Sequence, residues 1–171
     1  RMASRLRPRV GRRGAVAGRG DDMSRGYSVI ALDNPKCLAN LGGAFRAAQC
    51  YGASLVLVGG ARMERMKLKG LATDTMKAYR HLPVMWVADV AEHIPVDCIP
   101  VAVDLLDGAR SLSEYKHPER AIYFFGPEDG TLGKRITDRC RDKIMIPTNG
   151  CMNLAATVNV VMYDRLAKAM I

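Results

Sequence analysis

The sequence predicts an α/β protein with a mostly parallel, six-stranded β-sheet and helices on both faces of the sheet. Short apolar runs recur along the chain without strict polar alternation, as expected of strands that are buried on both sides. Segments with apolar residues at helical spacing lie between several of these runs. At 171 residues, the chain has the length of one domain with a real core.

The six expected strands are compact apolar runs bounded by turn residues. Asp33-Asn34-Pro35 ends the first run, and Pro147 follows the last, where a proline cannot continue a central ladder. The runs are Tyr27–Leu32, Ser54–Val58, Pro83–Val87, Cys98–Val103, Ala121–Phe125 and Lys143–Ile146.

Two helices carry the clearest signals. Residues 38–51 place apolar side chains at helical spacing, with Asn40 as the start of the helix and Gly52 as its stop. The last helix begins after Asn153, a candidate cap, and runs to the chain end. Shorter helical segments are expected at 73–79, 88–93 and 133–140, a turn or short helix at 111–115, and a mobile basic loop at 59–70.

Charge is concentrated at the amino end. The chain carries a formal charge of +9, and residues 1–22 supply +5 of it through seven Arg and two Asp. These residues are rich in Gly and Arg with little apolar periodicity, so we expect a flexible basic extension or expression-derived sequence before a domain that spans 23–171. The mildly basic remainder suits a polyanionic partner.

Several classes of protein are disfavoured by composition. No uncharged apolar run reaches the roughly 18 residues that a membrane span needs. The five cysteines are odd in number and include no CxxC pair, which favours a reduced, cytoplasmic protein. The three histidines show no metal-binding spacing, so no metal is assigned.

Three loops of unusual composition follow expected strands: Leu32–Asn40, Phe125–Gly133 and Ile146–Asn153. In a parallel sheet these loops meet at the carboxyl ends of the strands, where such folds bind ligands. The glycine-rich loop at 125–133 matches neither the phosphate-loop pattern nor GxGxxG.

Three motifs together resemble the SPOUT class (SpoU/TrmH family) of RNA methyltransferases. Asn40-x-Gly-x-x-x-Arg46 with Gly52 is similar to the first family motif, and Phe125-Gly-x-Glu128 with its later glycines is similar to the second. The third runs from Ile146-Pro147 to Cys151-Met-Asn-Leu-Ala155, with Cys151 and Ala155 where the family usually has hydroxyl residues.

This resemblance implies a C-terminal deep trefoil knot and membership of a minimal TrmL-like branch that modifies tRNA. It implies an S-adenosylmethionine-dependent RNA methyltransferase that modifies a ribose 2′-hydroxyl of tRNA or rRNA and works as a homodimer. The implied catalytic residues are Arg46, Asn40, Glu128 and Asn153, with Arg46 gripping a substrate phosphate. The implied cofactor-binding residues are Val103, Phe125, Gly126, Pro127, Gly130, Ile146, Cys151, Met152 and Leu154.

Two alternatives remain open. The same fold could methylate an RNA base, which would need the knot but not this role of Arg46. The chain could instead be an RNA-binding homologue without catalysis, and Cys151 and Ala155 give this alternative some weight.

Overall fold

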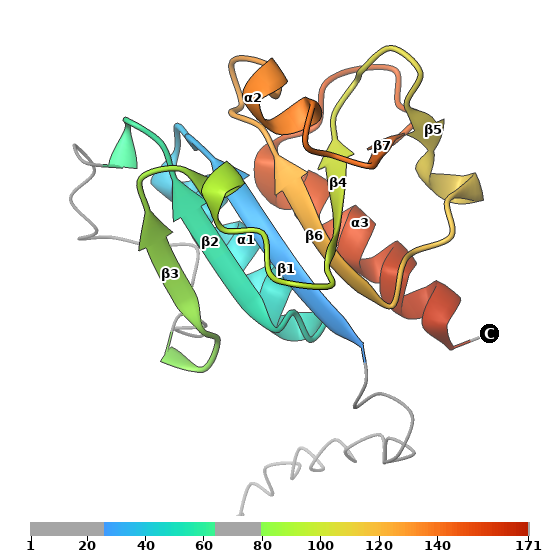
Figure 1. Ribbon diagram of the computed structural model, residues 1–171, viewed down its shortest axis with the longest axis horizontal. Helices are drawn as coiled ribbons and strands as arrows, with labels where there is room; N and C mark the ends of the chain where they lie inside the picture. Colours follow the sequence, from blue (N-terminus) through green and yellow to red (C-terminus); the bar gives the residue numbers. More distant parts are fainter. Residues whose placement is uncertain (1–25, 64–79, 171) are drawn as a thin grey trace, which may run out of the picture.

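A computed structural model describes residues 26–63 and 80–170. Its centre is a seven-stranded sheet in the order β3-β2-β1-β6-β4-β7-β5, in which all neighbouring strands are parallel (Figure 1). The parallel α/β architecture predicted from the apolar runs is therefore confirmed. The strands are β1 (Tyr27–Asp33), β2 (Leu55–Gly59), β3 (Val84–Val87), β4 (Ile99–Val103), β5 (Arg110–Ser111), β6 (Arg120–Phe125) and β7 (Asp142–Met145).

The number of strands differs from the prediction, which had six. The additional strand, β5, has two residues and pairs Arg110 with Ile144 of β7. Two residues are too few to produce a periodic signal in the sequence.

Each face of the sheet has its own apolar layer. Helices α1 (Leu38–Cys50) and α3 (Leu154–Ala169) pack side by side on one face, the far face in Figure 1. The short helix α2 (Lys134–Thr137) and the 3-10 turn η3 (Val90–Glu92) contribute to the layer on the other face. The expected two-sided cover is thus present, with the long helices on one side.

Helix α1 differs from the prediction at its start. It begins at Leu38, so Asn40 lies in its first turn, and Cys37 at the cap position makes no side-chain hydrogen bond. It ends as predicted before Gly52, which adopts a φ of 70°.

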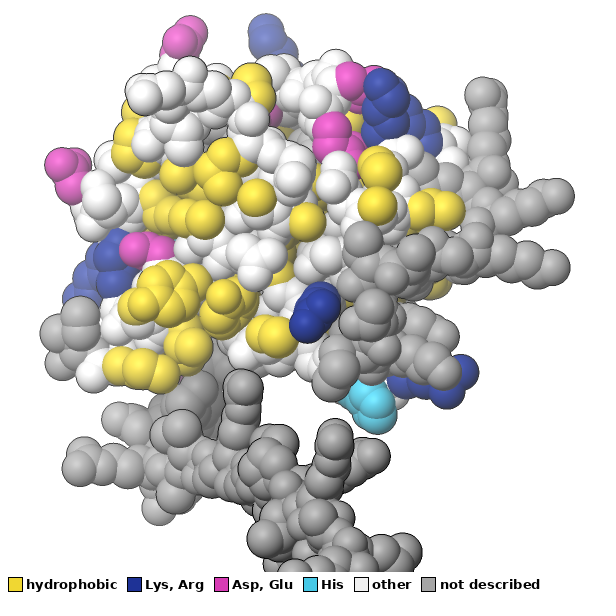
Figure 2. Space-filling view, turned by 180° about the vertical axis from the view of Figure 1, so that it is seen from behind, with side chains coloured by type: hydrophobic (Ala, Val, Ile, Leu, Met, Phe, Trp, Pro, Cys, Tyr) yellow, Lys and Arg dark blue, Asp and Glu magenta, His cyan; other side chains and the backbone are white. Residues whose placement is uncertain are grey.

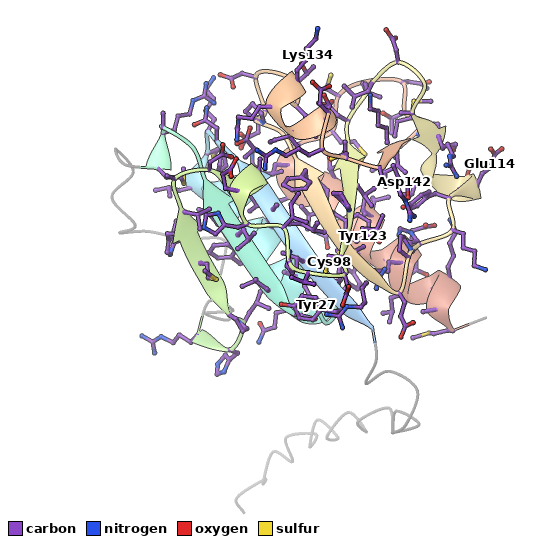
Figure 3. The ribbon with its side chains drawn as sticks, viewed as in Figure 1. Tyr27, Cys98, Glu114, Tyr123, Lys134 and Asp142 are labelled. Atoms are coloured by element: carbon purple, nitrogen blue, oxygen red, sulfur yellow. The ribbon has the colours of Figure 1, made fainter. Side chains whose placement is uncertain are left out.

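Helix α2 is shorter than the predicted 133–140. It ends at Thr137 because the chain must turn into β7, and the backbone N–H of Arg141 already donates to Pro100 O of β4 (3.0 Å). Lys134 at its start extends away from the sheet into solvent (Figure 3).

The last helix confirms the prediction at both ends. Asn153 caps α3 by accepting a hydrogen bond from the backbone N–H of Ala156 (2.8 Å), and the helix continues to Ala169. Its final turns are fastened to the segment before β6, since Arg165 donates to Pro118 O (2.5 Å) and Lys168 to Leu112 O (2.6 Å).

Some expectations concern other parts of the chain. The basic extension at 1–22, the helical segment at 73–79 and most of the basic loop at 59–70 lie outside the described residues. The trefoil knot remains a prediction of the family resemblance. Within the described ranges, no helix combines the length and apolarity needed to cross a membrane.

Candidate active site

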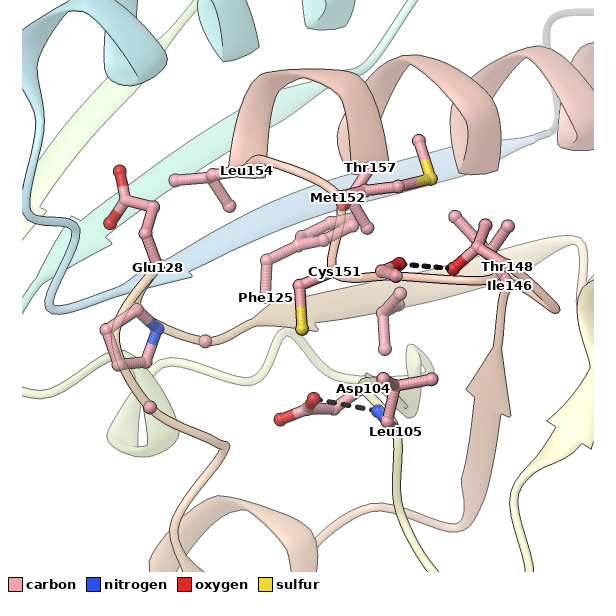
Figure 4. Close-up of a pocket in the computed structure, with 15 residues that line it drawn as sticks. Asp104, Leu105, Phe125, Glu128, Ile146, Thr148, Cys151, Met152, Leu154 and Thr157 are labelled. Atoms are coloured by element: carbon pink, nitrogen blue, oxygen red, sulfur yellow. Dashed lines mark hydrogen bonds between the residues drawn. The ribbon is translucent and has the colours of Figure 1, made fainter.

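A pocket lies where β4, β6 and β7 end, at the carboxyl edge of the sheet (Figure 4). The register places Val103, Phe125 and Ile144 side by side at the ends of these strands, so the loops that follow them meet. Every residue expected from the resemblance to bind the cofactor lines this pocket: Val103, Phe125, Gly126, Pro127, Gly130, Ile146, Cys151, Met152 and Leu154.

Glu128 also lines the pocket and joins the first motif to the second. Its carboxylate accepts hydrogen bonds from the backbone N–H of Lys36 (2.7 Å) and Cys37 (3.3 Å) and from the Asn40 side-chain amide (2.8 Å). Glu128 therefore caps the start of α1 from a distant loop. Burial alone would raise its pKa, but these hydrogen bonds lower the pKa below the ordinary value, so the group is ionised at neutral pH.

The other implied catalytic residues lie outside the pocket lining. Asn40 holds Glu128, and Asn153 caps α3. Arg46 is exposed on α1 and makes no hydrogen bond or ion pair with the described part of the chain. The structure therefore brings Asn40 and Glu128 together but does not bring Arg46 to its own pocket.

Asp104 is a pocket residue that the sequence analysis did not single out. One carboxylate oxygen accepts from its neighbour Leu105 N (2.7 Å), and the other accepts from Leu132 N (2.7 Å) in the glycine-rich loop. The same loop is tight at Gly126, where a Cβ would approach Leu132 N to 3.2 Å. Asp104 follows an apolar run at a strand end, which was the signal that could have identified it.

The third loop closes the pocket beside α3. Thr148 Oγ1 donates to Gly150 O (2.7 Å), as Figure 4 shows. Thr157 Oγ1 donates to Asn153 O (2.9 Å). Cys151 is an exposed free thiol on the same loop. Three further lining residues, Thr148, Gly150 and Thr157, escaped the sequence analysis because their hydrogen bonds are local and typical of ordinary turns and helices.

The chemistry of the lining restricts what the pocket can hold. Its walls combine apolar side chains such as Phe125, Ile146 and Met152 with exposed turns of backbone. Within the described part of the chain, the acids that line the pocket are Asp104 and Glu128, and no Lys, Arg or His lines it. Such a pocket suits a ligand with an apolar or aromatic body and positive charge, and it disfavours a bound phosphate. Among the described residues, no cluster of His, Cys, Asp or Glu could hold a metal ion.

Residues 27–163 match the model of the SpoU rRNA Methylase family. No curated protein matches the chain by sequence. The fold is similar to that of the SpoU methyltransferase AviRb of Streptomyces viridochromogenes in complex with AdoMet, at 18% identity and a TM-score of 0.74, with 85% of this chain and 59% of that one covered.

Two further structures have similar folds. An rRNA methyltransferase of Sinorhizobium meliloti shows 18% identity and a TM-score of 0.73 over 86% of this chain and 57% of that one. A protein solved in a study of the 2-OH methylation of C/U34 on tRNA shows 22% identity and a TM-score of 0.72 over 85% and 92%. The chain spans 57–60% of the length of the first structures that it matches.

Proposed function

The chain belongs to the SpoU rRNA methylase family, and we propose that it is an S-adenosylmethionine-dependent methyltransferase acting on a ribose 2′-hydroxyl of tRNA or rRNA. The observation that carries this proposal is the pocket, where the loops of the second and third family motifs converge and all the implied cofactor residues meet. The first motif joins them through the hydrogen bond from Asn40 to the pocket residue Glu128. Structures of similar fold concern rRNA methylation and tRNA 2-OH methylation, which supports both RNA classes as substrates.

The lining fits the proposed cofactor. S-adenosylmethionine combines an aromatic base with a positively charged sulfonium, and the pocket offers apolar walls and two carboxylates, with no competing cation among its described lining residues. Backbone groups near Val103, Gly126, Ile146 and Leu154 would hold the cofactor, which supplies an activated methyl group. The loops would orient that group toward the RNA oxygen.

Proton removal from the hydroxyl needs help from the protein. Glu128 is occupied by three donors, so its role is to build the site rather than to accept the proton. A guanidinium is a poor base, and that of Arg46 suits a substrate phosphate. Arg46 would hold the RNA and favour proton loss electrostatically.

The protein would act as a homodimer. Apolar side chains gather on the surface of the helical face (Figure 2), where Tyr163 of α3 is 61% exposed and packs edge-to-face with Tyr51. Pairing of these faces would cover Tyr163 and bring Arg46 of one subunit to the partner's pocket. The five free cysteines are consistent with the proposed cytoplasmic location.

Incubation with labelled S-adenosylmethionine and either unfractionated tRNA or rRNA tests the function. A 2′-O-methylated nucleoside in the digested RNA is the expected product. A methylated base would support the alternative reaction on the same fold, and RNA binding without label would support the inactive homologue. Light scattering of the parent protein and of Tyr163→Asp tests the dimer, since the variant should be monomeric if this face forms the interface.

A further inference from the structure

A nucleotide whose ribose 2′-hydroxyl reaches the cofactor at the pocket mouth carries a phosphate on each side. Among the described residues, none that lines the pocket is a cation, and a single guanidinium such as that of Arg46 can hold one phosphate. Further positive charge is therefore needed outside the lining but close to it.

Lys36 and Arg62 meet this requirement. Lys36 lies just before α1, and its backbone N–H donates to the pocket residue Glu128 (2.7 Å). Arg62 follows β2. Both side chains converge on Asp129, the neighbour of Glu128, with Lys36 Nζ 3.3 Å and Arg62 Nη1 2.8 Å from its carboxylate. The two cations thus flank the loop that forms one side of the pocket.

The Arg62 guanidinium is held in a fixed orientation. It binds Asp129 with two parallel hydrogen bonds of 2.8 and 3.0 Å, and it also donates to Asn34 O (3.3 Å). The backbone N–H of Arg62 donates to Asn34 Oδ1 (3.0 Å). Asn34 itself packs closely on Gly60, where a Cβ would lie 2.7 Å from the Asn34 Cα. This fork geometry fits two oxygens of a carboxylate or of a phosphate equally well.

The cluster remains accessible and incompletely neutralised. The side chains of Lys36, Arg62 and Asp129 are 61%, 38% and 37% exposed. Lys36 and Arg62 share the Asp129 carboxylate, so these three side chains together carry +1. The neighbouring Glu128 carboxylate is taken up by the backbone N–H groups of Lys36 and Cys37 and by Asn40. Exposed ion pairs contribute little to stability, so a phosphate could replace or join the carboxylate at low cost.

We propose that Lys36 and Arg62 form a phosphodiester-binding subsite for the substrate RNA at the rim of the cofactor pocket. Asp129 takes the place of the phosphate in the free protein and keeps the two cations together. The subsite rests on the proposed function, and it supplies a contact from the same subunit that holds the cofactor.

The test measures binding of labelled, unfractionated tRNA across a series of salt concentrations. The Lys36→Gln/Arg62→Gln variant should bind tRNA about tenfold more weakly at low salt and should lower the slope of log affinity against log salt by about 1 to 2. Cofactor affinity, measured by calorimetry, should stay at the parent value. Lys116→Gln is the control, because Lys116 is exposed and precedes β6, so it lies toward the amino ends of the strands and the pocket lies at their carboxyl ends.

Asp129→Asn separates RNA binding from a purely structural role. Removal of the competing carboxylate should preserve or strengthen tRNA binding if the cations serve the phosphate. Weaker binding in Asp129→Asn, matching that of the double variant, would show that the cluster only shapes the loop and would overturn the subsite. Parent-like affinity and salt slope in the double variant would overturn it as well. Failure of the parent to bind any RNA would instead contradict the proposed function.

Discussion

The Glu128 carboxylate accepts a 2.8 Å hydrogen bond from the Asn40 side-chain amide, although 88 positions separate the two residues. Together with the backbone N–H groups of Lys36 and Cys37, Asn40 turns this carboxylate into the cap of α1. The first two family motifs therefore form one structural unit, and Glu128 belongs to both the pocket and the helix start.

Removal of either partner should destabilise the fold through this contact. We expect Glu128→Gln to lower the free energy of unfolding by about 1–3 kcal/mol, because a charged acceptor and a helix cap are weakened together. In a double-mutant cycle with Asn40→Ala, the double variant should lose about 1 kcal/mol less stability than the sum of the two single losses. Urea denaturation measures both the stability loss of each variant and the coupling between the two substitutions. Glu114→Gln, at an exposed carboxylate near the edge of the molecule (Figure 3), is the control. Strictly additive losses would contradict the direct coupling.

The fold was largely predictable because its signals are local. Each strand of four or more residues coincides with an apolar run, and Asn153 and Gly52 mark helix boundaries by their own chemistry. The short strand β5 and the early end of α2 depend instead on pairing partners, Ile144 and Pro100, that are distant in sequence. No local pattern could report those contacts.

The residues of the site also divide into those that could be predicted and those that depend on contacts distant in sequence. The location of the site was predicted because loops that follow parallel strands gather at one edge of the sheet, and its individual residues were predicted from the family resemblance. The capping of α1 by Glu128 and the bond from Leu132 N to Asp104 join residues that lie far apart along the chain. Asn40 was therefore placed at the helix start, although it is the third residue of α1, which begins at Leu38, and its side chain holds Glu128.

Asp104→Asn should weaken cofactor binding. The carboxylate accepts from two backbone N–H groups, Leu105 N and Leu132 N, while an Asn side chain has one acceptor oxygen. One contact must be lost, which should loosen the glycine-rich loop. We expect about tenfold lower cofactor affinity, equivalent to about 1.4 kcal/mol for one hydrogen bond. Calorimetry measures the cofactor affinity, and Asp107→Asn, at an exposed neighbouring position, is the control. Unchanged affinity would show that the loop does not depend on Asp104.

Gly43→Ala should destabilise the packing of α1 against α3. Alanine usually stabilises a helix by about 1 kcal/mol relative to glycine. Here a Cβ at position 43 would lie 2.7 Å from the Ala155 Cβ, so the helices must move apart. We expect a net loss of about 1–2 kcal/mol, measured by urea denaturation. Adding Ala155→Gly should restore part of that loss, whereas Ala155→Gly alone should be destabilising. An additive double variant would contradict the steric explanation.

Stability should fall on mild acidification because of His117. This ring lies between Tyr123 OH (2.7 Å) and Asp164 Oδ2 (2.8 Å), and its side chain is 4% exposed. Burial lowers its pKa below the ordinary 6.5 and outweighs Asp164, while Arg165 and Lys168 lower the pKa further. The unfolded chain therefore takes up a proton at higher pH than the folded protein does.

The sign of the effect follows from that difference. The contribution of His117 to the free energy of unfolding is fully present above pH 6.5 and is lost as the pH falls toward the lowered pKa of the folded state. One proton gives a slope of at most about 1.4 kcal/mol per pH unit. Urea denaturation between pH 7.5 and about 5.5 should show this slope in the parent and in His93→Gln, whose histidine is exposed. A parent-like slope in His117→Gln would assign the effect to another group.

Arg46→Ala should abolish methyl transfer while leaving the protein dimeric and able to bind the cofactor. Arg46 is exposed and has no hydrogen bond or ion pair within the described chain, so its removal should cost little stability. Loss of a guanidinium that grips the substrate phosphate should cost about 2–4 kcal/mol in the reacting complex, or about two to three decades in rate. Arg46→Lys keeps the charge without the planar fork, so its methylation rate should lie between those of the parent and Arg46→Ala. Single-turnover methylation, calorimetry and light scattering measure rate, cofactor affinity and mass.

If Arg46 instead pairs with a carboxylate across a subunit interface, Arg46→Ala will lose dimer mass together with activity. A dimeric, cofactor-binding variant with the parent rate would end the catalytic assignment of Arg46.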